Sequence, residues 1–206
     1  KHVYWHSASH IMADAVMQLF PDAKPAIGPS IEDGFYYDFE VSQAFTEDDL
    51  RAIEEKMQEI IKADEAFSCT VEEKPEAEKL FEQKQNRYKL ELIDEIEDES
   101  VSLYQHGEFV DLCRGPHVPS TGRIKHVKLL SVAGAYWRGS EANVMLSRIY
   151  GTAYPSKEQL EEHLHLIEEA KRRDHRKIGR ELDLFSFHEE AGAGLVYYHP
   201  KGAMLR

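Results

Sequence analysis

The order of helical and strand patterns along the chain constrains its fold more than any other feature of the sequence. Residues 5–20 read as a helix that ends before Pro21, and residues 35–41 alternate between aromatic and polar side chains as a strand does. Residues 50–61 then repeat apolar side chains at helical spacing. Strands and helices are mixed without a regular strand–helix–strand repeat. This predicts an α+β fold, with a mixed or antiparallel sheet and packed helices, followed by a long connector helix.

Four other segments carry local predictions. Residues 67–71 alternate between apolar and polar side chains, which predicts a half-buried strand with Cys69 inside the core. Residues 88–92 also alternate and predict a strand. Residues 127–133 are apolar on both faces, which is typical of a central strand. A polar helix is predicted from residue 156 to about residue 173, and we expect it to be a connector.

Charge and composition exclude some classes of protein. The 206 residues carry a net charge of -13, which argues against a protein that coats nucleic acid by charge alone. The charge is uneven, because residues 171–180 hold six Lys or Arg and one Asp. No apolar run approaches the ~20 residues of a membrane-spanning helix, and two cysteines are too few for a disulfide framework. We therefore expect a cytoplasmic protein with no membrane partner, in which a local basic patch could still meet a polyanion.

Two motifs far apart in the sequence have spacings that suit a common site. His6 and His10 are four residues apart on the first predicted helix, so both imidazoles lie on one face. Asp111 and Cys113 share one side of a predicted strand, and His117 follows a Gly–Pro turn that can bring it back towards Cys113. The four imidazole and thiol groups, with a carboxylate beside them, are the candidate functional residues.

Three interpretations of this set remain open on the residues alone. Three imidazoles and a thiolate would make an acceptable tetrahedral Zn²⁺ site. The same groups, with Asp111 and a nearby lysine, could instead orient and deprotonate water without a metal. Each motif by itself also occurs among residues that have only a structural role. A functional interpretation therefore depends on the two motifs meeting in space.

Several longer motifs resemble the editing domain of the bacterial-type threonyl-tRNA synthetase family. These motifs are HSASH at 6–10, AIGP at 26–29, GFYYD at 34–38, DLCRGPH at 111–117, AGAYWRG at 133–139, RIYGTA at 148–153 and RDHRKIGRELDLF at 173–185. The histidine pair and the cysteine–histidine motif are shared with the alanyl-tRNA synthetase editing domain. The last motif resembles the entry to the class II catalytic core and makes the resemblance specific to the threonyl family, across essentially the whole chain.

The resemblance implies an editing domain over 1–154, a linker helix over 155–180 and the truncated start of a class II aminoacylation domain over 181–206. It also implies that a longer parent enzyme joins threonine to tRNA(Thr) with ATP, and that this piece hydrolyses mischarged Ser-tRNA(Thr). A second site is needed because one methyl group lets a binding pocket discriminate by only ~1–3 kcal/mol. Since nearly all of the catalytic core is missing, we expect no aminoacylation from this piece.

By the same resemblance, the catalytic groups would be His6, Lys89, Asp111 and Tyr37. His6 and Asp111 would hold or deprotonate water. Lys89 would stabilise the oxyanion or place water, and the Tyr37 hydroxyl would contact substrate or water. On the residues alone, Lys89 is also explained as a solvated lysine on a strand, and Tyr37 as a core aromatic.

The substrate-binding groups implied by the resemblance are His10, Cys113 and His117, which would line a pocket that excludes the threonine methyl. Gly28 and Pro29 would bring the backbone close to the terminal adenosine. The family implies water held by protein groups, so we expect no metal in this piece; a bound zinc would have as its ligands His6, His10, Cys113 and His117. ATP, Mg²⁺ and a further zinc would belong to the missing catalytic core. The expected partner is the acceptor end of tRNA(Thr) with its seryl ester, bound by a monomeric piece of a homodimeric parent.

Overall fold

The computed structural model describes residues 1–188, 190, 192 and 194–206. These residues form two compact units, Lys1–Lys157 and Glu158–Arg206, each of which is described by itself. Both units contain helices and antiparallel strands, which confirms the predicted α+β class.

A five-stranded antiparallel sheet forms the centre of the first unit, in the order β1–β3–β8–β7 with β2 also paired to β3. Its strands are β1 (Lys24–Pro25), β2 (Ser30–Ile31), β3 (Gly34–Glu40), β7 (His126–Tyr136) and β8 (Met145–Tyr154). The prediction of a central strand over 127–133 was wrong, because β7 pairs only with β8 and lies at the sheet edge. Its apolar side chains are explained by packing into the core, where Leu129 is buried and Val127 and Val132 are partly buried.

Two helices cover the inner face of this sheet. They are α1 (His2–Leu19) and α2 (Glu47–Ala63). The α2 helix begins with the capping box that its sequence contains: the Thr46 hydroxyl accepts from the Asp49 N–H, and the Asp49 carboxylate accepts from the Thr46 N–H. The aromatic side of β3 is fully buried in the same core as the apolar side of α2. This packing holds α1 firmly against the sheet.

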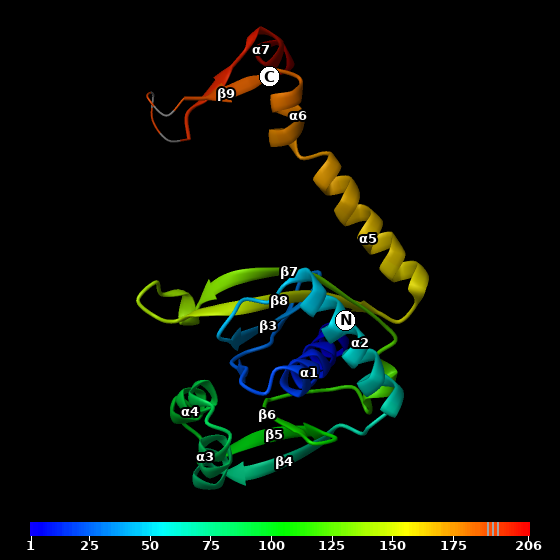
Figure 1. Ribbon diagram of the computed structural model, residues 1–206, viewed down its shortest axis with the longest axis vertical. Coiled ribbons are helices and arrows are strands. Elements are labelled where there is room, and N and C mark those ends of the chain that lie inside the picture. Colours follow the sequence, from blue (N-terminus) through cyan, green and yellow to red (C-terminus); the bar gives the residue numbers. More distant parts are fainter. Residues whose placement is uncertain (189, 191, 193) are drawn as a thin grey trace. The chain divides into compact units, whose positions relative to one another are not determined.

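A second, three-stranded sheet lies on the other side of α1 (Figure 1). It contains β4 (Ser68–Glu73), β5 (Ser100–His106) and β6 (Phe109–Leu112), all antiparallel. The prediction that Cys69 is a core residue was wrong: Cys69 is exposed, and Val71 is 69% exposed. The reason is that β4 is the edge strand, and its side chains are not covered by another layer.

Two short helices, α3 (Lys74–Gln83) and α4 (Arg87–Asp94), complete the first unit. The prediction of a strand over 88–92 was wrong, because these residues form most of α4. The Asn86 side chain caps this helix by accepting from the Lys89 N–H, and Tyr88 and Ile93 are buried. Five alternating residues are too few to distinguish a strand from a helix by periodicity.

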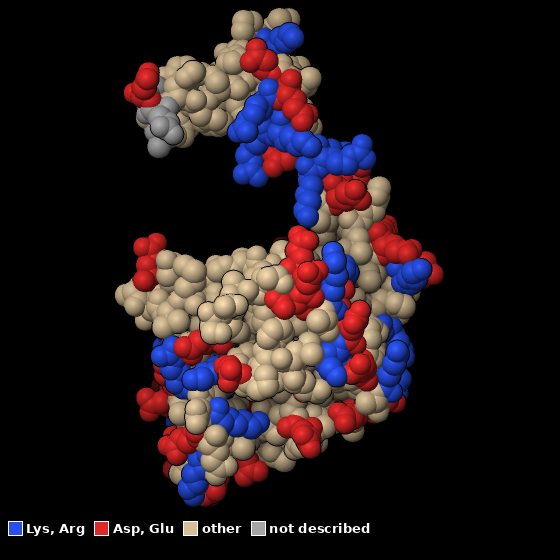
Figure 2. All heavy atoms as spheres, in the orientation of Figure 1, with Lys and Arg blue, Asp and Glu red and all other residues tan. Residues whose placement is uncertain are grey.

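The second unit contains α5 (Lys157–Arg172), α6 (His175–Glu181), β9 (Phe185–Phe187), β10 (Val196–Tyr198) and α7 (Pro200–Leu205). The single linker helix expected over 155–180 is instead two helices, α5 and α6. The chain breaks between them at Asp174, whose carboxylate accepts from the Arg176 N–H and caps the start of α6. Figure 2 shows the cations of 171–180 gathered where these helices meet. Residues 189, 191 and 193 of the predicted 181–206 domain lie outside the described residues. Among the described helices, none is long and apolar enough to cross a membrane.

Candidate functional site

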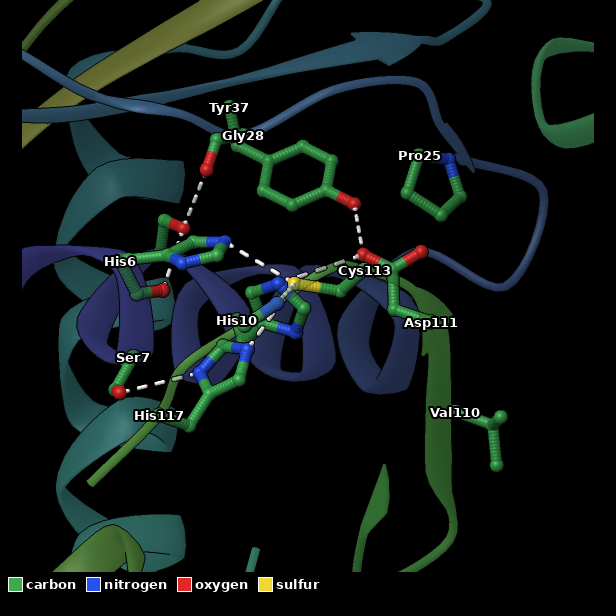
Figure 3. A network of polar contacts seen from close by, with 12 residues as sticks. His6, Ser7, His10, Pro25, Gly28, Tyr37, Val110, Asp111, Cys113 and His117 are labelled. Carbon is green, nitrogen blue, oxygen red and sulfur yellow. Dashed lines mark hydrogen bonds and ion pairs between the residues drawn. The ribbon is translucent and has the colours of Figure 1, made fainter. Parts of the chain in front are cut away.

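The structure brings the two sequence motifs together at the N-terminal half of α1. His6 and His10 project from one face of this helix towards the segment that follows β6 (Figure 3). The Cys113 Sγ lies 3.3 Å from the His6 Nε2 and 3.3 Å from the His117 Nε2. One ligand atom from each of the four side chains lies within 4.8 Å of every other. The geometric condition on which the functional interpretation depended is therefore met.

Local backbone structure explains how Cys113 and His117 face the same point. Cys113 directly follows β6, and its N–H donates to the Ser102 carbonyl of the neighbouring strand. Gly115 has a φ of 62°, a left-handed conformation that favours glycine and lets the chain reverse before His117. The Gly115 N–H also donates to the Cys113 Sγ at 3.2 Å. The turn therefore both positions His117 and orients the thiol.

Ser7, which sequence reasoning missed, determines which nitrogen of His117 carries a proton. The Ser7 hydroxyl donates to the Val3 carbonyl at 2.8 Å and accepts from the Val118 N–H at 3.0 Å. Its single proton is therefore used, so the His117 Nδ1, at 3.1 Å, is the donor in their contact. The His117 Nε2 then presents its lone pair to Cys113. Only the adjacency of Ser7 to His6 could have suggested this role.

Burial keeps the three imidazoles neutral at neutral pH. It lowers the pKa of His6, holds the pKa of His10 well below its usual value, and lowers the pKa of His117 to about 3; neighbouring histidines add to the last two effects. Burial raises the pKa of the Cys113 thiol to about 11, against the opposing hydrogen bond from Gly115. The cluster thus contains a neutral thiol and imidazole lone pairs that can accept a proton or bind a metal.

The four donor groups have the spacing and chemistry of a zinc site. Ligand atoms of a tetrahedral Zn²⁺ site lie about 3.3–3.6 Å apart, given Zn–N and Zn–S bonds of about 2.0–2.3 Å. The two sulfur–nitrogen distances of 3.3 Å, from Cys113 to His6 and to His117, match this spacing, all four donor atoms lie within 4.8 Å of one another, and the donors are the types that zinc prefers. The cluster of His6, His10, Cys113 and His117 could therefore hold a metal ion such as zinc.

A second group of polar side chains is buried directly beside this cluster. The Asp111 carboxylate receives the Lys89 Nζ at 2.6 Å and the Tyr37 hydroxyl proton at 2.5 Å, and the Lys89 Nζ lies 3.1 Å from the Tyr37 oxygen. Lys89 and Asp111 are each 2% exposed and Tyr37 is fully buried. The alternative of a solvated strand lysine is thus wrong for Lys89, whereas Tyr37 is both a core aromatic and a hydrogen-bond donor. Burial, and then the Asp111 charge, raise the pKa of Tyr37 well above its usual value.

The histidine–cysteine cluster and the buried Lys89–Asp111–Tyr37 group meet where His10 approaches Asp111. The His10 Nε2 lies 3.8 Å from the Asp111 Oδ2, and the His10 side chain is 3% exposed. His6 and His117 are partly buried, whereas His10 is buried. The arrangement places a neutral base, a fixed ammonium and a hydroxyl around one small region. These are the groups that hydrolysis of an ester or amide requires.

Gly28 and Pro29 lie in the loop that passes over the N-terminal half of α1. The Ser9 hydroxyl is 2.8 Å from the Gly28 carbonyl oxygen, which ties this loop to the helix (Figure 3). A Cβ on Gly28 would approach the Tyr37 ring to 2.0 Å, so only glycine fits there. The Pro29 carbonyl accepts from the Tyr36 N–H as β2 begins. Gly28 therefore borders the site directly, while Pro29 belongs to the strand pairing behind it.

Comparison with known proteins identifies the class of domain. Residues 101–150 match the family model described as the threonyl and alanyl tRNA synthetase second additional domain. The matched residues include all of β5 but its first residue, β6 and the segment that carries Asp111, Cys113 and His117. The fold and the cluster thus define a domain of the type found in these two synthetases.

Relatives of the whole chain narrow the class further. The threonine--tRNA ligase of Oleidesulfovibrio alaskensis is 61% identical over 201 residues, which cover 98% of this chain and 31% of the relative. Those of Caldanaerobacter subterraneus subsp. tengcongensis and Pelobacter propionicus are 58% and 59% identical, covering 100% and 98% of this chain and 32% of each relative. The chain belongs to the threonine--tRNA ligase family, and it spans about a third of the length of the curated relatives it matches.

Proposed function

We propose that this chain hydrolyses the ester bond of Ser-tRNA(Thr), so that it edits the product of a threonine--tRNA ligase. The observation that carries the proposal is the buried group of Lys89, Asp111 and Tyr37 beside the neutral imidazole of His6. Within the proposal, residues 1–154 form the editing domain, 155–180 the linker and 181–206 the start of the aminoacylation domain. A structural salt bridge alone would not need three neutral histidines next to it.

The proposed chemistry uses the chain's own groups. A water molecule attacks the seryl carbonyl carbon, and the neutral imidazole of His6 accepts the proton that the water loses. The Lys89 ammonium stabilises the oxyanion that forms, because it is held in place by Asp111 in a buried site. The ester C–O bond then breaks, and the leaving terminal ribose oxygen takes the proton from the His6 imidazolium, which returns His6 to its neutral form. Asp111 and Tyr37 position Lys89 and water.

Selectivity for serine is assigned to His10, Cys113 and His117. His117 is held by the hydrogen bond from its Nδ1 to Ser7 and by Phe67, whose ring is parallel to it within 5° at 4.8 Å. Its position therefore cannot adjust easily to an extra methyl group. A threonyl side chain would have to displace one of these fixed groups, so the correct product is protected by steric exclusion.

The wider setting of the proposal follows the longer relatives. The partner is the acceptor end of tRNA(Thr), and the basic surface of 171–180 favours contact with RNA despite the net charge of -13. ATP, Mg²⁺ and a further zinc belong to the remainder of the parent enzyme, which we propose to be a cytoplasmic homodimer. The chain itself is proposed to be a monomer that does not attach threonine to tRNA.

The decisive assay compares deacylation of Ser-tRNA(Thr) and Thr-tRNA(Thr) by the full chain. We expect hydrolysis of the seryl ester, little hydrolysis of the threonyl ester, and loss of activity in His6→Ala. Asp22→Asn, an exposed carboxylate away from the cluster, is the matched control and should retain activity. Binding of tRNA without cleavage of either ester would instead indicate an RNA-binding module and would contradict the proposal.

Metal removal distinguishes the proposal from a zinc-dependent hydrolase of small molecules. We expect purified chain to contain less than one zinc per molecule and to keep its hydrolytic activity after chelation, because His6 must be free to accept a proton. The measurements are metal analysis and activity before and after chelator treatment. Stoichiometric zinc, with activity that is lost on its removal and restored by zinc, would show that the metal-dependent mechanism is correct.

A further inference from the structure

The face of α1 that carries His6 and His10 bears a third polar side chain, Asp14, one helical turn beyond the histidine–cysteine cluster. His6, His10 and Asp14 are spaced four residues apart, so they follow one another along one face of the helix. Each contacts a polar group of the β5–β6 hairpin region. The His6 Nε2 lies 3.3 Å from the Cys113 Sγ, and the His10 Nε2 lies 3.8 Å from the Asp111 Oδ2. One turn further on, the Asp14 Oδ2 lies 3.3 Å from the His106 Nε2.

The three contacts form because the helix and the hairpin have matching repeats. Four residues of helix advance about 6.0 Å, and two residues of a strand advance about 6.6 Å. Asp111 and Cys113 are two residues apart on β6 and its continuation, and His106 ends β5 opposite Phe109, two residues before Asp111. Successive turns of α1 therefore meet successive same-face positions of the hairpin. The Asp14–His106 contact fixes this register at the end away from His6.

The Asp14–His106 pair is buried, although a polar pair at such a place is costly. His106 is 1% exposed and Asp14 is 7% exposed, and the neighbouring α1 residues Ile11, Met12 and Ala15 are fully buried and apolar. Burying polar groups costs several kcal/mol unless they are paired, so apolar side chains would stabilise this contact at least as well. The two His106 nitrogens have no hydrogen-bond partner of good geometry, and the Asp14 carboxylate faces the Nε2 at 3.3 Å. A role in register explains why a polar pair is used here.

The pair is also connected to His117 by ring packing. The Phe67 ring lies 4.7 Å from the His106 ring and is parallel to His117 at 4.8 Å. The Asp14 carboxylate is held by its own helix as well, since the Gln18 side chain donates to it at 2.9 Å. A shift of His106 would therefore move the surface against which His117 is packed.

We propose that Asp14 and His106 are a positioning pair that sets α1 on the hairpin so that His6 and His10 meet Asp111, Cys113 and His117. Neither residue touches the reacting atoms. The proposal rests on the hydrolytic function proposed above, because its main consequence is the rate of that reaction. A displacement of the catalytic groups by about 1 Å can lower a rate by about a hundredfold.

The test uses the full chain with Asp14→Leu, Asp14→Asn and His106→Phe. We expect Asp14→Leu and His106→Phe to lower kcat on Ser-tRNA(Thr) by about ten- to a hundredfold while KM changes little. Asp14→Asn should keep more activity, because its amide oxygen can still face His106. The double variant Asp14→Leu/His106→Phe should be no slower than the slower single variant, since the two residues act as one unit. Asp22→Leu is the control. Asp22 lines the same cavity of about 1060 Å³ as Asp14, but its side chain is exposed.

Two results would overturn the positioning role. The first is wild-type kcat in His106→Phe, which preserves an aromatic ring and would show that packing suffices. The second is additive losses in the double variant. If the wild-type chain hydrolyses neither ester, the proposed function fails, and ¹⁵N NMR of the histidine rings then tests the pair by itself. Asp14→Leu should shift the His6 and His117 signals and Asp22→Leu should not; unchanged signals in folded Asp14→Leu would contradict the proposal.

Discussion

Replacing Lys89 with methionine is expected to lower the rate of ester hydrolysis by about a hundred- to a thousandfold and to lower the free energy of unfolding by about 3–5 kcal/mol. Methionine has a similar length but no charge. The Asp111 carboxylate, which is only 2% exposed, then loses the Lys89 ammonium that lies 2.6 Å from it. The variant also removes the ammonium that we propose stabilises the oxyanion. The measurements are single-turnover deacylation of Ser-tRNA(Thr) and denaturant unfolding.

A second substitution separates the two effects of Lys89. Adding Asp111→Asn to Lys89→Met removes the unpaired charge, so stability should recover in large part while hydrolysis stays impaired. Lys56→Met is the matched control, because Lys56 pairs with Glu59 on the surface of α2 and should change the free energy of unfolding by no more than about 1 kcal/mol. Full activity in Lys89→Met would show that this ammonium has no part in the reaction.

Lowering the pH from 7 to 4 is expected to destabilise the chain through its buried histidines. The pKa of His117 is about 3 in the folded chain and about 6.5 when unfolded, so the unfolded chain binds one more proton between these values. Stability is therefore fully present above pH 6.5 and is lost as the pH falls towards 3. One such group accounts for up to about 3 kcal/mol at pH 4, at about 1.4 kcal/mol per pH unit. His6 and His10 act in the same direction.

His117→Gln provides the comparison for this effect. Glutamine does not titrate, so the dependence of the free energy of unfolding on pH should be shallower than in the wild type between pH 6.5 and 4. The measurement is denaturant unfolding at several pH values in this range, and His175→Gln serves as the control because His175 is exposed on α6. Equal pH slopes in wild type and His117→Gln would show that burial does not keep this imidazole neutral.

Residues with local signals were predictable from the sequence. The spacing of His6 and His10 requires only a helix for both rings to share a face, and the Thr46 capping box requires only four residues. Residue type also indicated that Cys113 and His117 could join them. That expectation concerned residues far apart in the chain, such as His6 and Cys113 at 107 positions, and only packing could fulfil it.

Other parts of the site depend on neighbours that are distant in sequence. Lys89 looked like an exposed strand residue, whereas the cap formed by Asn86 makes the segment helical and turns Lys89 inward to Asp111. Cys69 looked like a core residue, yet β4 is an edge strand and leaves it exposed. In both cases a short alternating pattern did not indicate which layer would cover the side chains, and at 88–92 it also predicted the wrong element.

From the amino-acid order alone come the α+β class, the helix with its histidine stripe and the chemical types of the groups that meet, because these depend on contacts between residues close in the chain. The tertiary structure decided the burial of Lys89 with Asp111, the proton position on His117 and the pairing of Asp14 with His106. Burial and long-range contact set the charge state and direction of a side chain, and neither is encoded within a few neighbouring residues.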